Sequence, residues 1–494
     1  MRTDKAAEKK DSVGKSIIFT YFFSVLSAIT GFTIVVVFSW LLSPEEWGVF
    51  TVAKRTGTLA ATIAVLGIPI AISRYIPMER ARKSSTALHY GTNAVYIVLI
   101  STSIAVVGWL IVLSVIPRNV LGEGTLVLPL FAATLFFVSL IWQLFTTSFL
   151  RAEGYIRHYN VMIFAGQVFQ LIFGCAAILV IGAMASYTIV GSSVGIFGVV
   201  LISIVLLKHL RIVFFRREYL DSRIQKELLT FGLPRMGMGI FDILLLSFSM
   251  LLLGFTGKTI EAGLFAIALQ FVAILQLIFQ PIAIVMLPEF SKLHGLQDSE
   301  NIKNKIQILT QGWIYIIVFI LIMVLTYIEP VFTFIFKADY ADAITIIKIL
   351  MIGVIPFSFY LTIYSYINAI LKRPVILYVL IIGLFVNMGM FFLLVPLMGA
   401  IGAAIATAGG MITVGILMVA LLLKFQPRAF AAVSLPDFIL CQVPLAGIIV
   451  SGLVIGNIFI LLFLTAGLLG VYIYLLKNRN IAWFTIIEKS YLKR

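Results

Sequence analysis

The hydrophobic and polar positions of this chain fall into long blocks rather than into the short periods of a soluble helix or strand. Apolar runs of about 20 residues, the length that crosses a bilayer as a helix, follow one another with short polar segments between them. They predict about 14 transmembrane helices, at residues 16–42, 51–73, 88–116, 125–150, 159–182, 186–207, 228–255, 260–287, 306–328, 343–370, 374–397, 399–423, 436–455 and 457–476. The expected fold class is an all-α integral membrane protein.

An internal repeat divides these helices into two sets. The sequence WGVFTVA at residues 47–53 matches AGLFAIA at residues 262–268, an offset of 215 positions. The copies open the second and the eighth predicted helix, so six helices separate them and both copies have the same orientation. The repeat predicts two six-helix lobes, at residues 16–207 and 228–423, with two extra helices after them. A chance match between apolar segments is the alternative.

The remaining segments are polar or amphipathic. Residues 1–15 are a polar N-terminal segment, and the apolar run after them is too long for the core of a cleaved signal peptide. Residues 208–227 are basic and amphipathic, which indicates a linker lying on the inner leaflet. The extra helices occupy residues 436–476, and the tail at 477–494 has the same character as the linker.

Composition supports a membrane protein and argues against an enzyme. Of the 494 residues, 61% are hydrophobic and 12% are charged, and the mean hydropathy is +1.11. No loop combines carboxylates, histidine or a nucleophile in a catalytic pattern, so we expect neither catalysis nor a resident cofactor or metal. Cysteine and histidine are scattered, without disulfide or metal-ligand spacing, at Cys175, Cys441, His89, His158, His209 and His294.

The distribution of positive charge predicts the orientation of the chain. With both termini in the cytoplasm, 29 of the 36 Lys and Arg residues fall in cytoplasmic segments, three in outer loops and four within predicted spans. Such an excess in cytoplasmic loops is the usual topology signal. The net charge of +15 is then explained by topology and by attraction to anionic inner-leaflet lipids. It requires no nucleic-acid partner.

The four cations within the spans are the main candidates for function: Lys54, Arg55, Arg235 and Lys348. Charged side chains inside a bilayer are costly and commonly face a water-filled cavity on a substrate path. The alternative is that each side chain extends to the nearer interface, since all four lie within a few turns of a predicted helix end. Neighbouring positions differ by about 100° around a helix. Lys54 and Arg55 can therefore both line a wide cavity, but they cannot lie on one narrow stripe of the helix.

One acidic residue, Asp242, lies near the middle of a predicted span. It follows Arg235 by seven residues, which places it on the same helix face and about 10 Å deeper. The polar residues Gln143, Gln270 and Asn387 are candidates either for lining a cavity or for hydrogen bonds between helices. Four embedded cations against one acid would make a net positive cavity. That charge suits an anion such as a phosphate or pyrophosphate group.

Four segments resemble a known family of membrane proteins. They are LLSPEEWGVFTVAKRTGTLAATIAVLGIPIAISRYIP at 41–77, FLRAEG at 149–154, FGLP at 231–234 and GAIGAAIAT at 399–407. Together with the plan of six, six and two helices, they resemble polysaccharide and oligosaccharide flippases. These belong to the multidrug/oligosaccharidyl-lipid/polysaccharide exporter (MOP) superfamily. The resemblance spans essentially the whole chain.

The resemblance implies two six-helix lobes around a central cavity that opens alternately to each side. Related lipid II flippases carry cavity arginines, one of them in the second helix, and Lys54 or Arg55 matches that role. The predicted first helix of this chain has no basic residue, a departure that weighs against lipid II as the cargo. An acid in the seventh helix binds a coupling cation in some superfamily members, and Asp242 matches it for Na⁺ or H⁺. The usual acidic partner in a later helix is absent.

The expected function is that of a flippase, which moves a polyprenyl-pyrophosphate oligosaccharide from the inner to the outer leaflet of the plasma membrane. Cell-surface polysaccharide assembly would use such a step, so assembly enzymes are expected partners of a monomeric protein. One alternative is a cation-coupled multidrug or metabolite antiporter of the same superfamily. The other is a membrane scaffold that transports nothing, in which the embedded charges would form closed pairs.

Overall fold

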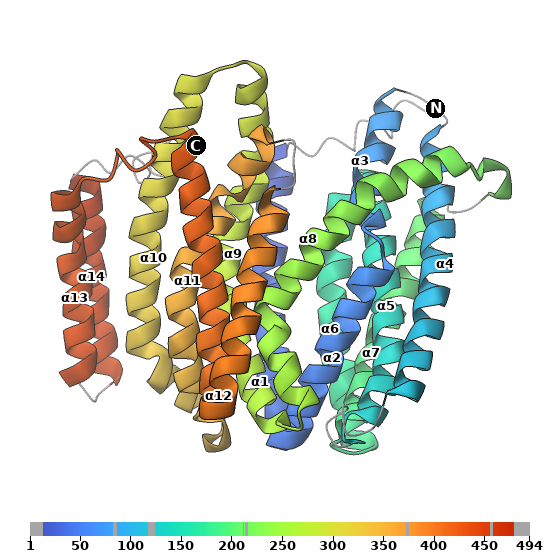
Figure 1. Cartoon of the computed structure of the whole chain (residues 1–494), viewed down its shortest axis with the longest axis horizontal. Helices are drawn as coiled ribbons and strands as arrows, with labels where there is room; N and C mark the ends of the chain where they lie inside the picture. Colours follow the sequence, from blue (N-terminus) through green and yellow to red (C-terminus); the bar gives the residue numbers. More distant parts are fainter. Residues whose placement is uncertain are drawn as a thin grey trace. The chain divides into compact units, whose positions relative to one another are not determined.

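The computed structural model describes residues 13–82, 86–116, 124–210, 212, 216–371, 375–454 and 458–478. This part of the chain is all-α and contains no strand. Its α-helices are α1 Val13–Leu41, α2 Pro44–Ala64, α3 Ile68–Ala81, α4 Thr86–Val115, α5 Val127–Ala152, α6 Ile156–Val180, α7 Ala185–His209, α8 Ser222–Phe255, α9 Thr259–Gly295, α10 Ser299–Ile335, α11 Ala343–Ile370, α12 Val375–Phe425, α13 Leu435–Val454 and α14 Ile458–Asn478. The expected fold class is confirmed (Figure 1).

These helices differ from the predicted spans most clearly in one place. The second predicted span consists of two helices, α2 and α3, which are bent by 42°. The eleventh and twelfth predicted spans are the two segments of α12, which meet at a non-helical kink at Gly399. A Cβ atom on Gly409 would collide with Met390 Sδ, so the two segments fold back on each other as two separate spans would. Among the described residues, ten helices are long and apolar enough to cross a membrane, or eleven if α2 and α3 count as one.

The break between α2 and α3 lies against α8. Leu66 and Gly67 both have positive φ values, 51° and 68°, which a bulky side chain such as leucine rarely adopts. A Cβ atom on Gly67 would lie 2.8 Å from the carbonyl carbon of Gly232 in α8. Two features therefore require glycine at position 67: the positive φ of its backbone and the close approach of α8 at Gly232.

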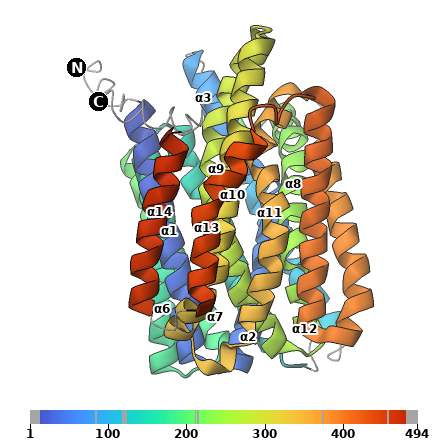
Figure 2. The same ribbon diagram turned by 90° about the vertical axis from the view of Figure 1, so that its left-hand side faces the viewer.

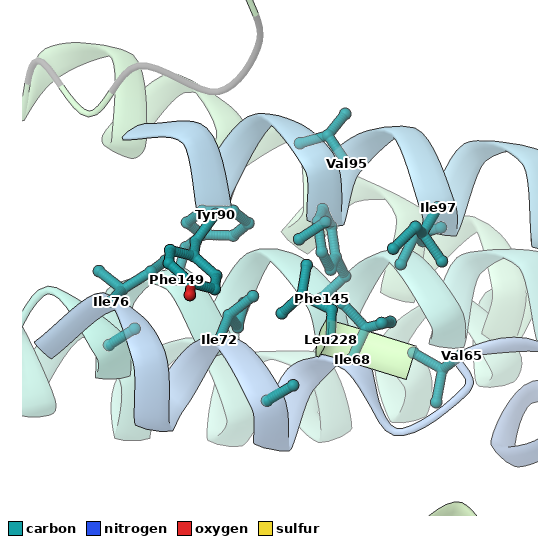
Figure 3. Packing of buried hydrophobic residues seen from close by; sticks show 14 of the residues in the cluster. Val65, Ile68, Ile72, Ile76, Tyr90, Val95, Ile97, Phe145, Phe149 and Leu228 are labelled. Atoms are coloured by element: carbon teal, nitrogen blue, oxygen red, sulfur yellow. The ribbon is translucent and has the colours of Figure 1, made fainter. Parts of the chain in front are cut away.

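The chain divides into two compact units, residues 1–270 and residues 271–494, so the boundary falls inside α9. In the first unit, a core of buried apolar residues joins α2, α3, α4 and α5 to the start of α8. Figure 3 shows Ile72 and Ile76 of α3 facing Tyr90 of α4, with Phe149 of α5 among them. This core positions the N-terminal half of α8 against α3 and α4.

The predicted linker at residues 208–227 overlaps the end of α7, at His209, and the first turns of α8. It holds one short 3-10 turn, Arg217–Tyr219, and α8 already begins at Ser222. Asn93 of α4 fixes this segment, because its side chain donates to Tyr219 O at 2.8 Å and accepts from Asp221 N at 3.0 Å. Hydrogen bonds to a buried amide therefore hold the start of α8. Its proposed position on the inner leaflet stays a prediction.

The two copies of the sequence repeat contact each other within the first unit. Trp47, which is buried, donates its indole Nε1–H to Gly263 O at 3.1 Å. A Cβ atom on Gly263 would lie 3.0 Å from the Cα atom of Gly48. Gly48 and Gly263 are equivalent positions of the repeat, separated by the same offset of 215. The N-terminal turns of α2 and α9 thus cross with their backbones almost in contact.

The second unit packs α11 along α12 and α10 against α11 and α13. In Figure 2, α13 and α14 run side by side. A buried cluster joins these two helices to α10, and within it Tyr472 donates its hydroxyl to Tyr315 O at 3.2 Å. The hydroxyls of Tyr327 and Thr465 also bond α10 to α14. The two C-terminal helices are thereby attached to the unit through α10.

Candidate functional site

Lys54 and Arg55 lie well inside α2 rather than at its start. Ser43 caps the helix by accepting a hydrogen bond from Glu46 N at 3.2 Å, so the helix begins at Pro44, earlier than predicted. Lys54 is therefore about 15 Å along the helix from its first residue. Residues Trp47–Ala53 just before it are all buried, while Lys54 and Arg55 are half-buried. The earlier helix start makes it harder for either side chain to reach the near interface.

Arg55 is held by α8, which runs beside α2 (Figure 1). Its Nε–H donates to Ser247 Oγ at 2.5 Å, and Ser247 is fully buried. Asp242, on the same helix, interacts electrostatically with Arg55. No ion pair within 4.0 Å joins these two side chains in the described structure. Arg55 thus donates one hydrogen bond to a neutral hydroxyl and has a carboxylate nearby. The positive charge of Arg55 is therefore only partly compensated.

Lys54 has no closer partner than an aromatic ring. Its ammonium nitrogen lies 5.7 Å from the centroid of the buried Phe50 ring, within the range of a cation–π contact. In the part of the chain that the structure describes, it makes no hydrogen bond or ion pair. Lys54, Arg55 and Asp242 together carry a formal charge of +1. Such a group favours an anion over a cation.

Arg235 belongs to a different place on α8. It precedes Ser247 by twelve residues, about 18 Å along the helix. Its Nη1 donates to Phe231 O at 2.9 Å, and its guanidinium carbon lies 3.5 Å from the centroid of the Phe231 ring. The structure therefore brings Arg55 and Asp242 together and places Arg235 in a second cluster nearer the start of α8.

Lys348 pairs with a carboxylate that the sequence placed in a loop. Helix α10 continues to Ile335, beyond the predicted end at residue 328, so Glu329 is helical and faces α11. Lys348 Nζ donates to Glu329 Oε1, and the two side chains are 40% and 63% exposed. An exposed pair of this kind already satisfies the lysine. Its role as a cavity cation stays a prediction with less support than that of Arg55.

The three candidate polar residues lie in separate places. Gln143 of α5 packs over Gly166 of α6, where a Cβ atom would come within 2.9 Å of its Cδ atom. Gln270 of α9 lies near Gly31 of α1, with its Nε2 atom 3.6 Å from the position of a Cβ there. Asn387 of α12 is fully buried. Gln143 and Gln270 therefore fill contacts between helices beside glycines, and a cavity role for the three residues stays a prediction.

Ser247 is the site residue that sequence reasoning missed. It stands in the apolar run LLLSFSM, where a serine commonly bonds to the backbone of its own helix. Only the pairing of α2 with α8 reveals it as the acceptor for Arg55. No group of three or more His, Cys, Asp or Glu side chains that could hold a metal ion is found among the described residues.

Comparison with solved structures defines the class of fold. A structure described as the lipid II flippase MurJ in an inward closed conformation aligns with a TM-score of 0.71 at 16% identity, over 97% of this chain and 100% of that chain. An inward-facing multidrug resistance MATE transporter of the MOP superfamily aligns with a TM-score of 0.63 at 16% identity, over 83% and 96%. A MOP superfamily transporter from Pyrococcus furiosus, described as having a binding pocket of reverse polarity, aligns with a TM-score of 0.56 at 15% identity, over 84% and 96%. The fold is that of MOP superfamily transporters.

Comparison of sequences gives the family. The family described as polysaccharide biosynthesis protein matches residues 13–294, more than half of the chain. The protein belongs to this family. A search of curated proteins finds no match. The structural neighbours are described as transporters and as a flippase, and the chain is a multi-pass membrane protein.

Proposed function

We propose that the protein is a flippase for a lipid-linked oligosaccharide, which it moves from the inner to the outer leaflet by alternating access. The observation that carries this proposal is the cation pair of α2: Lys54 without a hydrogen-bonding partner and Arg55 held by the neutral Ser247 hydroxyl. The polysaccharide biosynthesis family and the fold shared with a lipid II flippase support it. The cargo would present a pyrophosphate group to these cations.

The chemistry of the site suits that cargo. Arg55 uses its Nε–H on Ser247, which leaves the terminal nitrogens of its fork for two parallel bonds to phosphate oxygens. Lys54 adds a point charge from the adjacent position. At an effective dielectric constant of about 20, each contact between unit charges at 4 Å contributes about 4 kcal/mol. Two such contacts offset part of the cost of removing a pyrophosphate from water.

Asp242 has a defined role in this proposal. Without cargo, its carboxylate compensates part of the Arg55 charge, which lowers the cost of keeping two cations inside a span. A bound pyrophosphate would compete with Asp242 for Arg55, so Asp242 prevents the cargo from binding too tightly to be released. We propose that Asp242 takes up Na⁺ or H⁺ when the cargo is bound, which would couple the two.

Reconstituted flipping tests the proposal. Proteoliposomes would carry a fluorescent polyprenyl-pyrophosphate oligosaccharide, and transfer between leaflets would be followed by quenching from outside. We expect Lys54→Gln with Arg55→Gln to lower the flipping rate at least tenfold, and Ser247→Ala to lower it less. The matched control is Arg80→Gln, an arginine of α3 that is already paired with Glu153 at 2.9 Å. Wild-type flipping by the double variant at equal reconstitution would refute the assignment.

A cation-coupled antiporter is the second candidate function, favoured by the MATE transporters among the structural neighbours and by Asp242 inside α8. It predicts export of cationic dyes, which Asp242→Asn would abolish. The charges disfavour it, because Asp242 lies beside two cations that would repel a cationic substrate. Dye resistance in cells that express the protein, lost in the Asp242→Asn variant, would establish this function instead.

A further inference from the structure

A second group of cations lies at the end of the first unit that the charge distribution assigns to the cytoplasm. Arg74 of α3 and Arg235 of α8 both place their guanidinium groups over the ring of Phe231, at 4.5 and 3.5 Å from its centroid. The two guanidinium carbons are therefore at most about 8 Å apart, both within the range of a cation–π contact. Like charges repel at this distance, and an anion in contact with both groups would relieve that repulsion.

A network of aromatic and acidic side chains supports the Phe231 ring, which we call the platform of this group. The Tyr75 and Tyr90 rings stack at 5.1 Å with an angle of 7°, and Tyr75 meets Phe231 edge-on at 5.4 Å. Tyr90, only 6% exposed, donates its hydroxyl to Glu227 at 2.6 Å. Glu227 precedes Phe231 by four residues, on the same face of α8. The platform is therefore fixed from α3, α4 and α8 at once.

Glu227, the carboxylate bonded within this network, makes no ion pair with Arg74 in the described structure. Glu227 forms its hydrogen bonds with Tyr90 and Tyr75. Arg74 is exposed and has no ion pair in the described structure. Its neighbours on α3 differ, because Arg80 pairs with Glu153 and Arg82 pairs with Glu79, each at 2.9 Å. The positive charge of Arg74 is left for a ligand.

A third arginine is bonded to Ser73, the residue before Arg74. Arg151 of α5 donates its Nε–H and Nη2–H to the single oxygen of Ser73, at 3.2 and 2.9 Å, next to Arg74 in sequence. A guanidinium fork normally matches the two oxygens of a carboxylate or phosphate. Here it meets a neutral hydroxyl, and its side chain is exposed over the ring of Tyr159 at 5.2 Å. The same end of the unit therefore holds two arginines over the Phe231 ring and a third that is bonded to the residue before Arg74.

We infer that Arg74 and Arg235 on the Phe231 platform, with Arg151 beside them, form a binding site for the phosphate groups of a lipid headgroup. This site lies about 18 Å along α8 from the contact between Arg55 and Ser247, so it is separate from the cation pair of α2. Guanidinium groups suit phosphate because the fork matches two of its oxygens. That the headgroup is the cargo's pyrophosphate rather than a phospholipid's phosphate rests on the proposed function.

Binding measurements on the purified full-length protein test the site with two probes. One is a polyprenyl pyrophosphate, titrated in detergent, and the other is phosphatidylglycerol, titrated in nanodiscs of otherwise zwitterionic lipid. For Arg74→Gln with Arg235→Gln we expect at least tenfold weaker binding of the pyrophosphate lipid. For Phe231→Leu, which keeps both charges but removes the platform, we expect a three- to tenfold loss. Arg80→Gln, the paired arginine of the same helix, should change binding less than twofold.

The outcomes separate the sources of the phosphate. Loss of pyrophosphate binding alone supports the site as a receptor for the cargo. An equal loss with phosphatidylglycerol supports the same phosphate site occupied by membrane phospholipid. Unchanged binding of both probes by the double variant, or an equal loss in Arg80→Gln, would overturn the inference. Arg74→Lys with Arg235→Lys, which keeps the charges, controls for folding and should recover part of the affinity. Because the readout is binding, failure of the flipping proposal would leave this result interpretable.

Discussion

The crossing of α2 and α9 predicts that Gly48→Ala strongly destabilises the protein. A Cβ atom at position 48 would lie 2.5 Å from the carbonyl carbon of Thr259 and closer still to its oxygen. Carbon atoms pack at about 3.5 to 4.0 Å. The two helices would therefore have to separate by about 1 Å at their N-terminal turns.

The cost of this separation follows from two contacts. Overpacking of a close contact costs about 1–3 kcal/mol. The same shift would stretch the bond from Trp47 Nε1 to Gly263 O beyond its 3.1 Å, and an unsatisfied buried donor costs about 1–3 kcal/mol. Alanine regains up to about 1 kcal/mol of helix propensity. We expect a net loss of about 3 kcal/mol in the free energy of unfolding.

Unfolding in mixed micelles, titrated with SDS, measures this difference. The matched control is Gly108→Ala in α4, where a Cβ atom would have no neighbour within 4 Å. This substitution should leave the free energy of unfolding unchanged or raise it slightly. Gly263→Ala should resemble Gly48→Ala, and the double variant should lose less than the sum because both changes disrupt one contact. A Gly48→Ala variant as stable as the Gly108→Ala control would refute the reasoning.

Three further predictions concern single contacts. Gly67→Ala should lower the free energy of unfolding by about 2 kcal/mol or more, because it adds a clash with Gly232 to an unfavourable φ. The SDS titration measures this loss. Tyr90→Phe should cost about 1.5–3 kcal/mol by removing the donor to Glu227, whereas Tyr96→Phe, in the same helix, should cost less than half of that. Lys348→Gln should change stability by less than about 1 kcal/mol and flipping by less than twofold, because Glu329 already pairs with it; a large loss of flipping would restore Lys348 as a cavity cation.

Much of the fold could be predicted because its elements are long and apolar. The predicted spans match most of the helices, and the main exception is a break that a continuous apolar run hides. Residues 65–69 read VLGIP, a glycine and a proline that signal a helix end and a helix start. The run around them is nevertheless continuous, so the break between α2 and α3 was missed. The kink at Gly399 falls where two spans were predicted to meet.

The candidate site was less accessible to sequence reasoning. Lys54, Arg55 and Asp242 stand out because charge is rare in an apolar run. Ser247 does not, since it lies 192 residues from Arg55 and matters only through that contact. Glu329 was misplaced because a polar residue near the end of an apolar run reads as a loop, although α10 continues through it. Pairings between helices that are distant in sequence depend on tertiary packing. The pattern of apolar residues in one segment does not show which other helix packs against it.

The contact between the repeat copies has a consequence for how the family can vary. Gly48 and Gly263 occupy equivalent positions of the sequence repeat. A Cβ atom on Gly48 would meet the Thr259 backbone of α9, and a Cβ atom on Gly263 would meet Gly48 itself. A larger residue at either position therefore acts on the same crossing. We therefore expect the two positions to covary among related sequences, with small residues retained as a pair wherever the indole corresponding to Trp47 is present.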